Sequence, residues 1–212
     1  MKSTFRVFPF LLLILTFNSP FVSAQNIDLT VMYGYNFDDK FDVSSGYGKI
    51  SDGGLFAGLL SFGIKENYDI ELYYSRQEAK FDFEYYYNNI FQELRNEPAS
   101  MNYIQLGGCR NQNLDAAGKA IGFGGLNLGA AGIVPDSDRY EDIWKFAFGL
   151  KAGIKYFFNE KFGLRLQTNL QVPVLYTAGS IWVGTGGASV GMSAGSTITQ
   201  FGFSGGLIYR LK

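Results

Sequence analysis

The segment WKFAFGLKAGIKY, residues 144–156, decides the fold class of this 212-residue chain. Every second residue, from Trp144 to Tyr156, is apolar, and the residues between them are lysine, glycine and alanine. A helix cannot sort the residues in this way, because its period of 3.6 would mix the two sets on every turn. The segment therefore predicts a long β-strand with one apolar face and one polar face.

The same alternation continues along most of the chain. Residues 163–172 repeat it most clearly, with Leu164 and Leu166 opposing Arg165 and Gln167. Further strands are expected at 27–35, 50–64, 68–75, 100–110, 119–133 and 201–212, of which those near 50–64, 100–110 and 119–133 are rich in glycine. Eight strands of this length predict an all-β, antiparallel, up-and-down barrel that could cross a bilayer.

The connections between these strands alternate in length. Residues 65–67 and 159–161 are tight turns, whereas longer polar, aromatic or Gly/Ser-rich connections are expected at 38–46, 78–99, 134–143 and 174–196. Short turns at one end and long loops at the other are typical of outer-membrane barrels. Within 78–99, Phe81, Phe83 and Tyr85 either offer contact surface to an extracellular partner or prolong the hairpin.

Aromatic residues gather at the ends of the expected strands, which predicts two girdles at membrane–water interfaces. The girdle residues are Tyr33, Tyr35, Tyr68, Tyr74, Trp144, Tyr156 and Tyr209. The apolar faces between them carry no charge, as a lipid-facing surface requires, because Lys or Arg costs about 2–4 kcal/mol at the bilayer midplane. The alternative is a soluble, secreted, lipocalin-like barrel, in which the apolar faces would line a ligand cavity.

Charged residues fall on the opposite faces, which a membrane barrel would turn toward its lumen. They are Asp28, Asp69, Glu71, Lys145, Lys151, Lys155, Arg165 and Arg210. Like charges would repel in a narrow lumen, so the three acids are the expected counter-ions of the bases. This pattern favours a salt-bridged plug, and the alternative is a narrow pore for anions or other small solutes, lined by lysines.

The first 24 residues predict a cleaved secretory signal peptide. Lys2 and Arg6 precede an apolar run at 8–17, which is too short to span a membrane, and small residues lead to cleavage between Ala24 and Gln25. The remaining barrel domain, 25–212, keeps 16 basic and 19 acidic residues, a net charge of −3. That charge argues against a nucleic-acid partner.

Three stretches resemble the small bacterial outer-membrane β-barrel domain family of the OmpA/OmpX type. They are GYGKISDGGLFAGLLSFGIKENYDIELYYSRQ (46–77), MNYIQLGG (101–108) and FGLRLQTNLQVPV (162–174). The resemblance implies a cell outer-membrane location and contact with outer-membrane lipids and lipopolysaccharide. It also implies assembly by the barrel-assembly machinery, although the last strand ends on Leu211 and Lys212 rather than on the usual terminal Phe.

The chain contains no histidine. Ser-His acyl transfer and imidazole metal sites both need one, so no catalytic, cofactor-binding or metal residue is expected and the chain is not expected to be an enzyme. Acidic clusters at 38–42 and 136–142 could bind a divalent cation, but solvated loop charge is the simpler interpretation. The expected role is therefore structural or interactive at the cell envelope.

Overall fold

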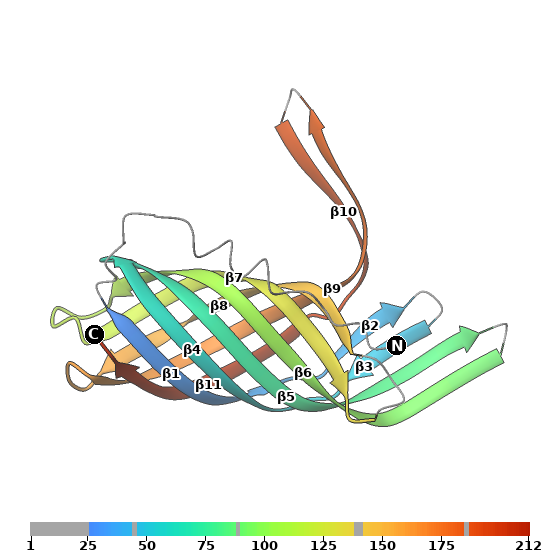
Figure 1. Ribbon diagram of the computed structural model, residues 1–212, viewed down its shortest axis with the longest axis horizontal. Helices are drawn as coiled ribbons and strands as arrows, with labels where there is room; N and C mark the ends of the chain where they lie inside the picture. The colour runs from blue at the N-terminus through green and yellow to red at the C-terminus, as the bar shows by residue number, and fades with distance from the viewer. Residues whose placement is uncertain (1–25, 44–45, 88–89, 138–141, 185–186) are drawn as a thin grey trace, which may run out of the picture.

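The computed structural model describes residues 26–43, 46–87, 90–137, 142–184 and 187–212, and the expected cleavage site at Ala24 and Gln25 lies outside these ranges. The described residues form eleven strands (Figure 1). They are β1 (Ile27–Asn36), β2 (Asp39–Val43), β3 (Gly46–Ile50), β4 (Gly53–Lys65), β5 (Tyr68–Tyr87), β6 (Ile90–Asn113), β7 (Ala120–Pro135), β8 (Ile143–Phe157), β9 (Phe162–Gly184), β10 (Gly187–Thr197) and β11 (Gln200–Arg210).

Eight of the strands close into an antiparallel barrel. The order around the ring is β1, β4, β5, β6, β7, β8, β9 and β11, and β11 pairs back with β1. Leu29, for example, pairs with Leu60 of β4 on one side and with Tyr209 of β11 on the other. Within the ring, closure gives every strand a partner on both sides and leaves no sheet edge. The predicted eight-stranded up-and-down barrel is confirmed.

The two ends of the barrel differ. At one end, here called the short-turn end, brief turns join β4 to β5, β6 to β7 and β8 to β9, and β1 begins beside the end of β11. At the other end, here called the hairpin end, strands run past the barrel wall (Figure 1). This alternation of short and long connections follows the sequence prediction.

Three of the four segments expected to be loops, 38–46, 78–99 and 174–196, are mostly β-strand. β2 and β3 form a small hairpin whose second strand pairs with the extension of β5, and β9 continues into a hairpin with β10 that rises away from the barrel in Figure 1. β5 and β6 stay paired through Tyr87 and Ile90, so the backbone through 81–85 does prolong the hairpin. A register shift between Phe81 and Phe83 is accommodated where the N–H of Asn96, a residue with φ of 56°, donates a 2.7 Å hydrogen bond to Asp82.

The apolar faces of the barrel strands point outward. On β1, Leu29, Val31 and Tyr33 are exposed, whereas Asp28 and Thr30 are buried. β5, β8, β9 and β11 show the same order, with most leucine, isoleucine and aromatic residues outside and most polar residues inside, although Tyr73, Phe157 and Ile208 are buried. This is the reverse of a lipocalin-like barrel, whose apolar residues would face the interior.

The interior is packed, and its two halves differ in chemistry. Toward the hairpin end a hydrophobic cluster, with Met32, Leu55, Leu59, Phe81 and Met101 all at most 2% exposed, shares the lumen with the hydrogen-bonded buried amides of Asn36, Gln77 and Gln200. Toward the short-turn end most of the buried side chains are charged or amide-bearing, with Phe123, Phe157 and Ile208 packed among them. A charged plug was predicted, but the apolar half was not. The described ranges contain no helix that could span a membrane.

Candidate functional site: the charged lumen

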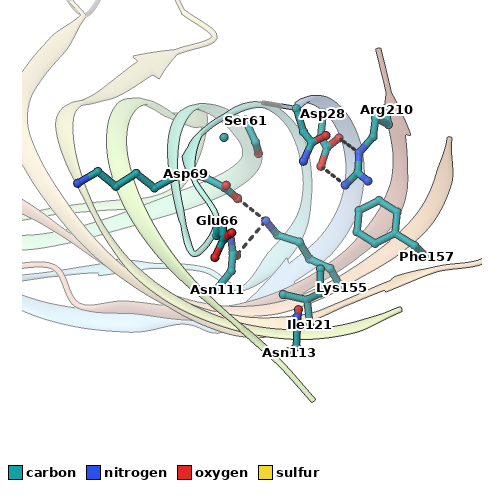
Figure 2. Close-up of a pocket in the computed structure, with 13 residues that line it drawn as sticks. Asp28, Ser61, Glu66, Asp69, Asn111, Asn113, Ile121, Lys155, Phe157 and Arg210 are labelled. Carbon is teal, nitrogen blue, oxygen red and sulfur yellow. Dashed lines mark hydrogen bonds and ion pairs between the residues drawn. The ribbon is translucent and has the colours of Figure 1, made fainter. Parts of the chain in front are cut away.

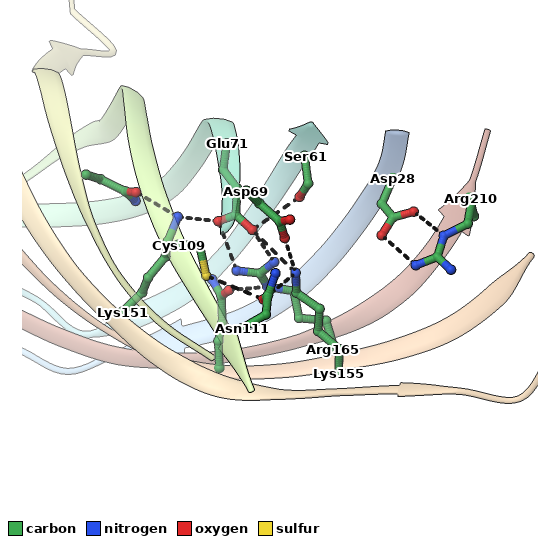
Figure 3. Close-up of polar contacts among 12 residues, drawn as sticks. Asp28, Ser61, Asp69, Glu71, Cys109, Asn111, Lys151, Lys155, Arg165 and Arg210 are labelled. Atoms are coloured by element: carbon green, nitrogen blue, oxygen red, sulfur yellow. Dashed lines mark hydrogen bonds and ion pairs between the residues drawn. The ribbon is translucent and has the colours of Figure 1, made fainter. Parts of the chain in front are cut away.

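Glu71 lies at the centre of the charged half of the lumen (Figure 3). It projects inward from β5 and its side chain is fully buried. The guanidinium of Arg165, on β9, donates two hydrogen bonds to its carboxylate, at 2.8 and 3.2 Å. Lys151, on β8, pairs with the same carboxylate, and the hydroxyl of Ser61 donates a further bond at 3.2 Å. One carboxylate therefore holds two cations at once.

Lys155 joins a second acid to this cluster. Its ammonium lies 2.7 Å from a carboxylate oxygen of Asp69 and 3.8 Å from one of Glu71, and it also donates to the side chain of Asn111 at 3.3 Å. We call Asp69, Glu71, Lys151, Lys155 and Arg165 the ion cluster. Because strands β5 and β9 stand opposite each other in the ring of eight, the Glu71–Arg165 contact spans the lumen from wall to wall.

The ion cluster holds three cations and two anions. Moving such ions out of water costs several kcal/mol each unless partners replace the lost hydration. Neutral groups contribute here: Lys151 donates to Asn127 at 2.7 Å, and Arg165 donates to Gln167 at 2.6 Å. The ring of Phe123 also lies beneath the guanidinium of Arg165, 4.0 Å from the ring centroid, which is close enough for a cation–π interaction.

Glycines in the wall make room for these long side chains. A Cβ atom on Gly107 would lie 2.0 Å from Oδ1 of Asn127, and one on Gly125 would lie 3.0 Å from Cε of Lys151. Real Cβ atoms are not found at the first of these distances, and a Cβ on Gly107 would also lie 2.4 Å from the backbone oxygen of Leu126, so a larger residue at 107 would require both the Asn127 side chain and the neighbouring backbone to move. Eight strands leave an interior only just wide enough for side chains, and the glycines provide the remaining space.

A second ion pair closes the short-turn mouth (Figure 2). Arg210 of β11 donates two hydrogen bonds to Asp28 of β1, at 2.9 and 3.2 Å, and its guanidinium stacks over Phe157 at 4.2 Å. A pocket of about 80 Å³ lies between this pair and Lys155. Small-molecule sites usually measure about 300–1,000 Å³, so this pocket can hold only a few waters.

The structure brings seven of the eight expected lumen charges to this half of the barrel, and the exception is Lys145. Alternation along β8 puts Lys145 on the same face as Lys151. Lys145 is nevertheless exposed and forms no ion pair within the described part of the chain. Six residues separate the two lysines, about 20 Å along a strand, which puts Lys145 at the hairpin end. Including it in the network was wrong.

Several network members were missed from the sequence. Ser61, Asn127 and Phe123 contact the charged groups, and all three lie on inward positions of glycine-rich strands. Amides extend the network toward the middle of the lumen, where Gln105 donates to Gln171 at 2.9 Å. The sequence could have indicated them if the glycine-rich strands had been aligned with their clearer neighbours, because the alternation of inward and outward positions would then have placed these residues inside.

The expected girdle residues all face outward, in two groups. Tyr68, Tyr156 and Tyr209 lie near the short-turn end, and Tyr33, Tyr35, Tyr74 and Trp144 lie toward the hairpin end. Phe158 and Phe162 join the first group through ring contacts with Tyr156 and Tyr209. Twelve residues separate Trp144 from Tyr156 on β8. At about 3.3 Å per residue and a typical tilt of about 40°, that corresponds to a band roughly 30 Å tall.

The acidic segments at the hairpin end contain ordinary polar contacts. Asp38 pairs with Lys49 at 2.9 Å, and this exposed partner lowers the pKa of the Asp38 carboxyl. Asp39 accepts a hydrogen bond from the backbone N–H of Thr199 at 2.6 Å. Asp138 and Glu141 lie outside the described residues. Within the described ranges, no group of three or more His, Cys, Asp or Glu side chains could hold a metal ion.

A closed eight-stranded barrel with an apolar outer wall, aromatic residues at both ends and a polar, filled lumen has the fold of the small outer-membrane barrels. Two outer-membrane proteins are among the solved structures similar to it. Neisserial surface protein A matches with a TM-score of 0.53 and 11% identity, over 86% of this chain and 96% of its own. The outer-membrane protein OprG from Pseudomonas aeruginosa matches with a TM-score of 0.55 and 11% identity, over 89% of this chain and 96% of its own.

Identities this low establish the fold and no more. No family model matches the chain, and no curated protein matches it in sequence. The structural likeness therefore agrees with the resemblance drawn from the sequence, and activity has to be argued from the residues themselves.

Proposed function

We propose that this protein is an integral outer-membrane β-barrel with a structural or surface-interaction role at the cell envelope. The observation that carries the proposal is the outer wall. Large apolar side chains, such as Leu150, Leu166 and Leu207, are at least 50% exposed between two sets of aromatic residues. Exposure of this kind around a whole barrel is unfavourable in water and suits a bilayer, in which aromatic residues take the interfaces.

The proposal includes a route to the membrane. The first 24 residues act as a signal peptide cleaved before Gln25, and the barrel-assembly machinery then inserts the chain. The short-turn end faces the periplasm and the hairpin end faces the outside, which is the layout usual for such barrels. Outer-membrane lipids and lipopolysaccharide surround the wall.

The filled lumen favours a closed barrel over a pore. Lys151 and Arg165 are both paired with Glu71 and nearly inaccessible, and the hydrophobic cluster with Met32 and Leu55 occupies the lumen toward the hairpin end. A conducting path would have to break the ion cluster and then displace this hydrophobic cluster and the buried amides beside it, such as Asn36 and Gln77. We therefore assign function to the hairpins and the outer surface rather than to transport through the lumen.

We also infer that the protein is not an enzyme, because the whole sequence lacks the histidine on which most hydrolytic sites depend. The hairpins built from β2–β3, β5–β6 and β9–β10 are the parts that reach furthest from the barrel. They are the expected contact surface for an extracellular partner.

Envelope fractionation with a heat-modifiability test examines the proposal. The protein should remain with the membrane pellet and run faster in SDS without boiling than after boiling, because a closed barrel resists SDS. Recovery in the soluble fraction with no mobility shift would refute the membrane assignment. In planar bilayers the folded protein should show no discrete conductance steps. Steps that disappear when Lys151 is replaced by glutamine would instead favour the pore.

A further inference from the structure

The outer wall contains a groove that the closed lumen does not explain. It lies across β6, β7 and β8 near the short-turn end and has a volume of about 560 Å³. Its floor is one rung of the sheet, in which Arg110 pairs with Gly124 and Gly124 pairs with Ala152. Small side chains on two of these three positions leave the wall hollow where its neighbours carry leucine and isoleucine.

The groove is open space rather than a packed gap. A Cβ atom added to Gly124 would meet nothing closer than a backbone oxygen at 3.9 Å. At the turn side, Leu114 bounds the groove, since its side chain lies 3.2 Å from where a Cβ of Gly122 would stand. The volume falls in the range of small-molecule sites, and the lining next to the bilayer is mainly glycine, alanine and leucine.

Arg110 gives the groove a charge. It faces outward on β6, is exposed, and forms no ion pair with any carboxylate in the described part of the chain. Its pairing partner on the other side is Tyr68, a member of the aromatic group at the short-turn end. Such aromatics sit at the level of lipid headgroups, so the guanidinium lies at the depth of the phosphates. An arginine at that depth is well placed to bind an anion, and guanidinium groups bind phosphate through paired hydrogen bonds.

We propose that this groove binds one anionic phospholipid, with its phosphate on Arg110 and an acyl chain lying over Gly124 and Ala152. The site rests on the proposed membrane location, because only a bilayer presents a phosphate and an acyl chain together at this depth. The charge of Arg110 and the apolar floor beneath it match the two parts of such a lipid.

The test compares lipid retention by four proteins. Wild type, Arg110→Gln, Gly124→Leu and the control Lys161→Gln are refolded into vesicles of equal parts phosphatidylglycerol and phosphatidylcholine, released into mild detergent and weighed by native mass spectrometry. Wild type should retain one phosphatidylglycerol in preference to phosphatidylcholine. Arg110→Gln should lower that preference about tenfold, the effect of losing a charged hydrogen bond. Lys161→Gln, an exposed cation outside the groove, should keep it.

Gly124→Leu tests the acyl-chain part of the site, since it fills the groove and keeps the charge. It should lose the retained lipid of either headgroup. Equal preference in wild type and Arg110→Gln would overturn the proposal, as would retention by Gly124→Leu or a dimer that covers the groove. A protein that is not a membrane barrel would give a different result from a barrel that lacks this lipid site. It would show no heat-modifiable band in any vesicle.

Discussion

Replacing Glu71 with glutamine should destabilise the barrel more than any surface charge substitution. The change keeps the size of the side chain and removes the charge that Arg165, Lys151 and Lys155 share. The ion cluster would pass from three cations and two anions to three cations and one anion. Asp69 would remain, but its contact is with Lys155 alone.

The size of the effect follows from burial. The side chains of Glu71 and Arg165 are both fully buried, and removing one partner of such a pair typically costs about 3–5 kcal/mol. Glu78→Gln is the matched control, because Glu78 pairs with Arg76 at 2.8 Å on the same strand while both side chains are largely exposed. Exposed pairs of this kind are worth about 0–1 kcal/mol.

The assay is urea-induced unfolding in vesicles, followed by loss of the heat-modifiable band. A double variant makes the test more specific. Glu71→Gln raises the net charge of the ion cluster from +1 to +2, and adding Lys151→Met returns it to +1. Lys151→Met alone should destabilise, and in the Glu71→Gln background it should stabilise, so the sign of its effect reverses. A loss below about 1 kcal/mol for Glu71→Gln, comparable with Glu78→Gln, would refute the account of the cluster. So would a Lys151→Met effect of the same sign in both backgrounds.

Three further predictions concern the wall and the hairpins. Leu150→Lys places a charge midway between the two aromatic groups on β8 and should cost about 2–4 kcal/mol in the urea assay, and a loss under about 0.5 kcal/mol would contradict the outward, lipid-facing assignment. Gly107→Ala, whose Cβ would collide with Asn127, should lower stability by about 1–3 kcal/mol, whereas Gly58→Ala, with nothing within 4 Å, should leave it nearly unchanged; equal effects would show that the glycine is not needed for space. Replacing residues 176–196 with a short turn should leave heat-modifiability intact, because β9 and β11 pair through 162–171; failure of the shortened protein to fold would mean that the β9–β10 hairpin is part of the barrel's stability.

Alternation of polar and apolar residues predicted the barrel because it is a local property of each strand. Residues 144–156 and 163–172 indicate their faces without any tertiary information, and the observed burial follows the expected alternation except at Lys145, which is exposed, and Val172, which is buried. Residues 53–65 carry apolar side chains on both faces, so parity alone does not separate outward Phe56 from inward Leu55 and Leu59. The apolar half of the lumen was missed for this reason.

The ion cluster shows a second limit of pattern reading. The alternation of residues along a strand tells which face a side chain is on, but not how far along the barrel it lies. Lys145 was grouped with Lys151 for this reason. Counter-ions were expected in general, but the particular pairing of Glu71 with Arg165 joins residues 94 positions apart. That pairing depends on the stagger of strands around the closed ring, which no single strand's sequence contains.

The contact between β5 and β9 has a mechanical consequence. A thin-walled tube under sideways load fails first by flattening, and the lateral pressure of lipid on a small barrel is such a load. Glu71 and Arg165 form a strut across the diameter, and Lys151 and Lys155 anchor it to a third wall. The short-turn end is thereby held round, and the hairpin end can change in sequence or length without altering the cross-section below it.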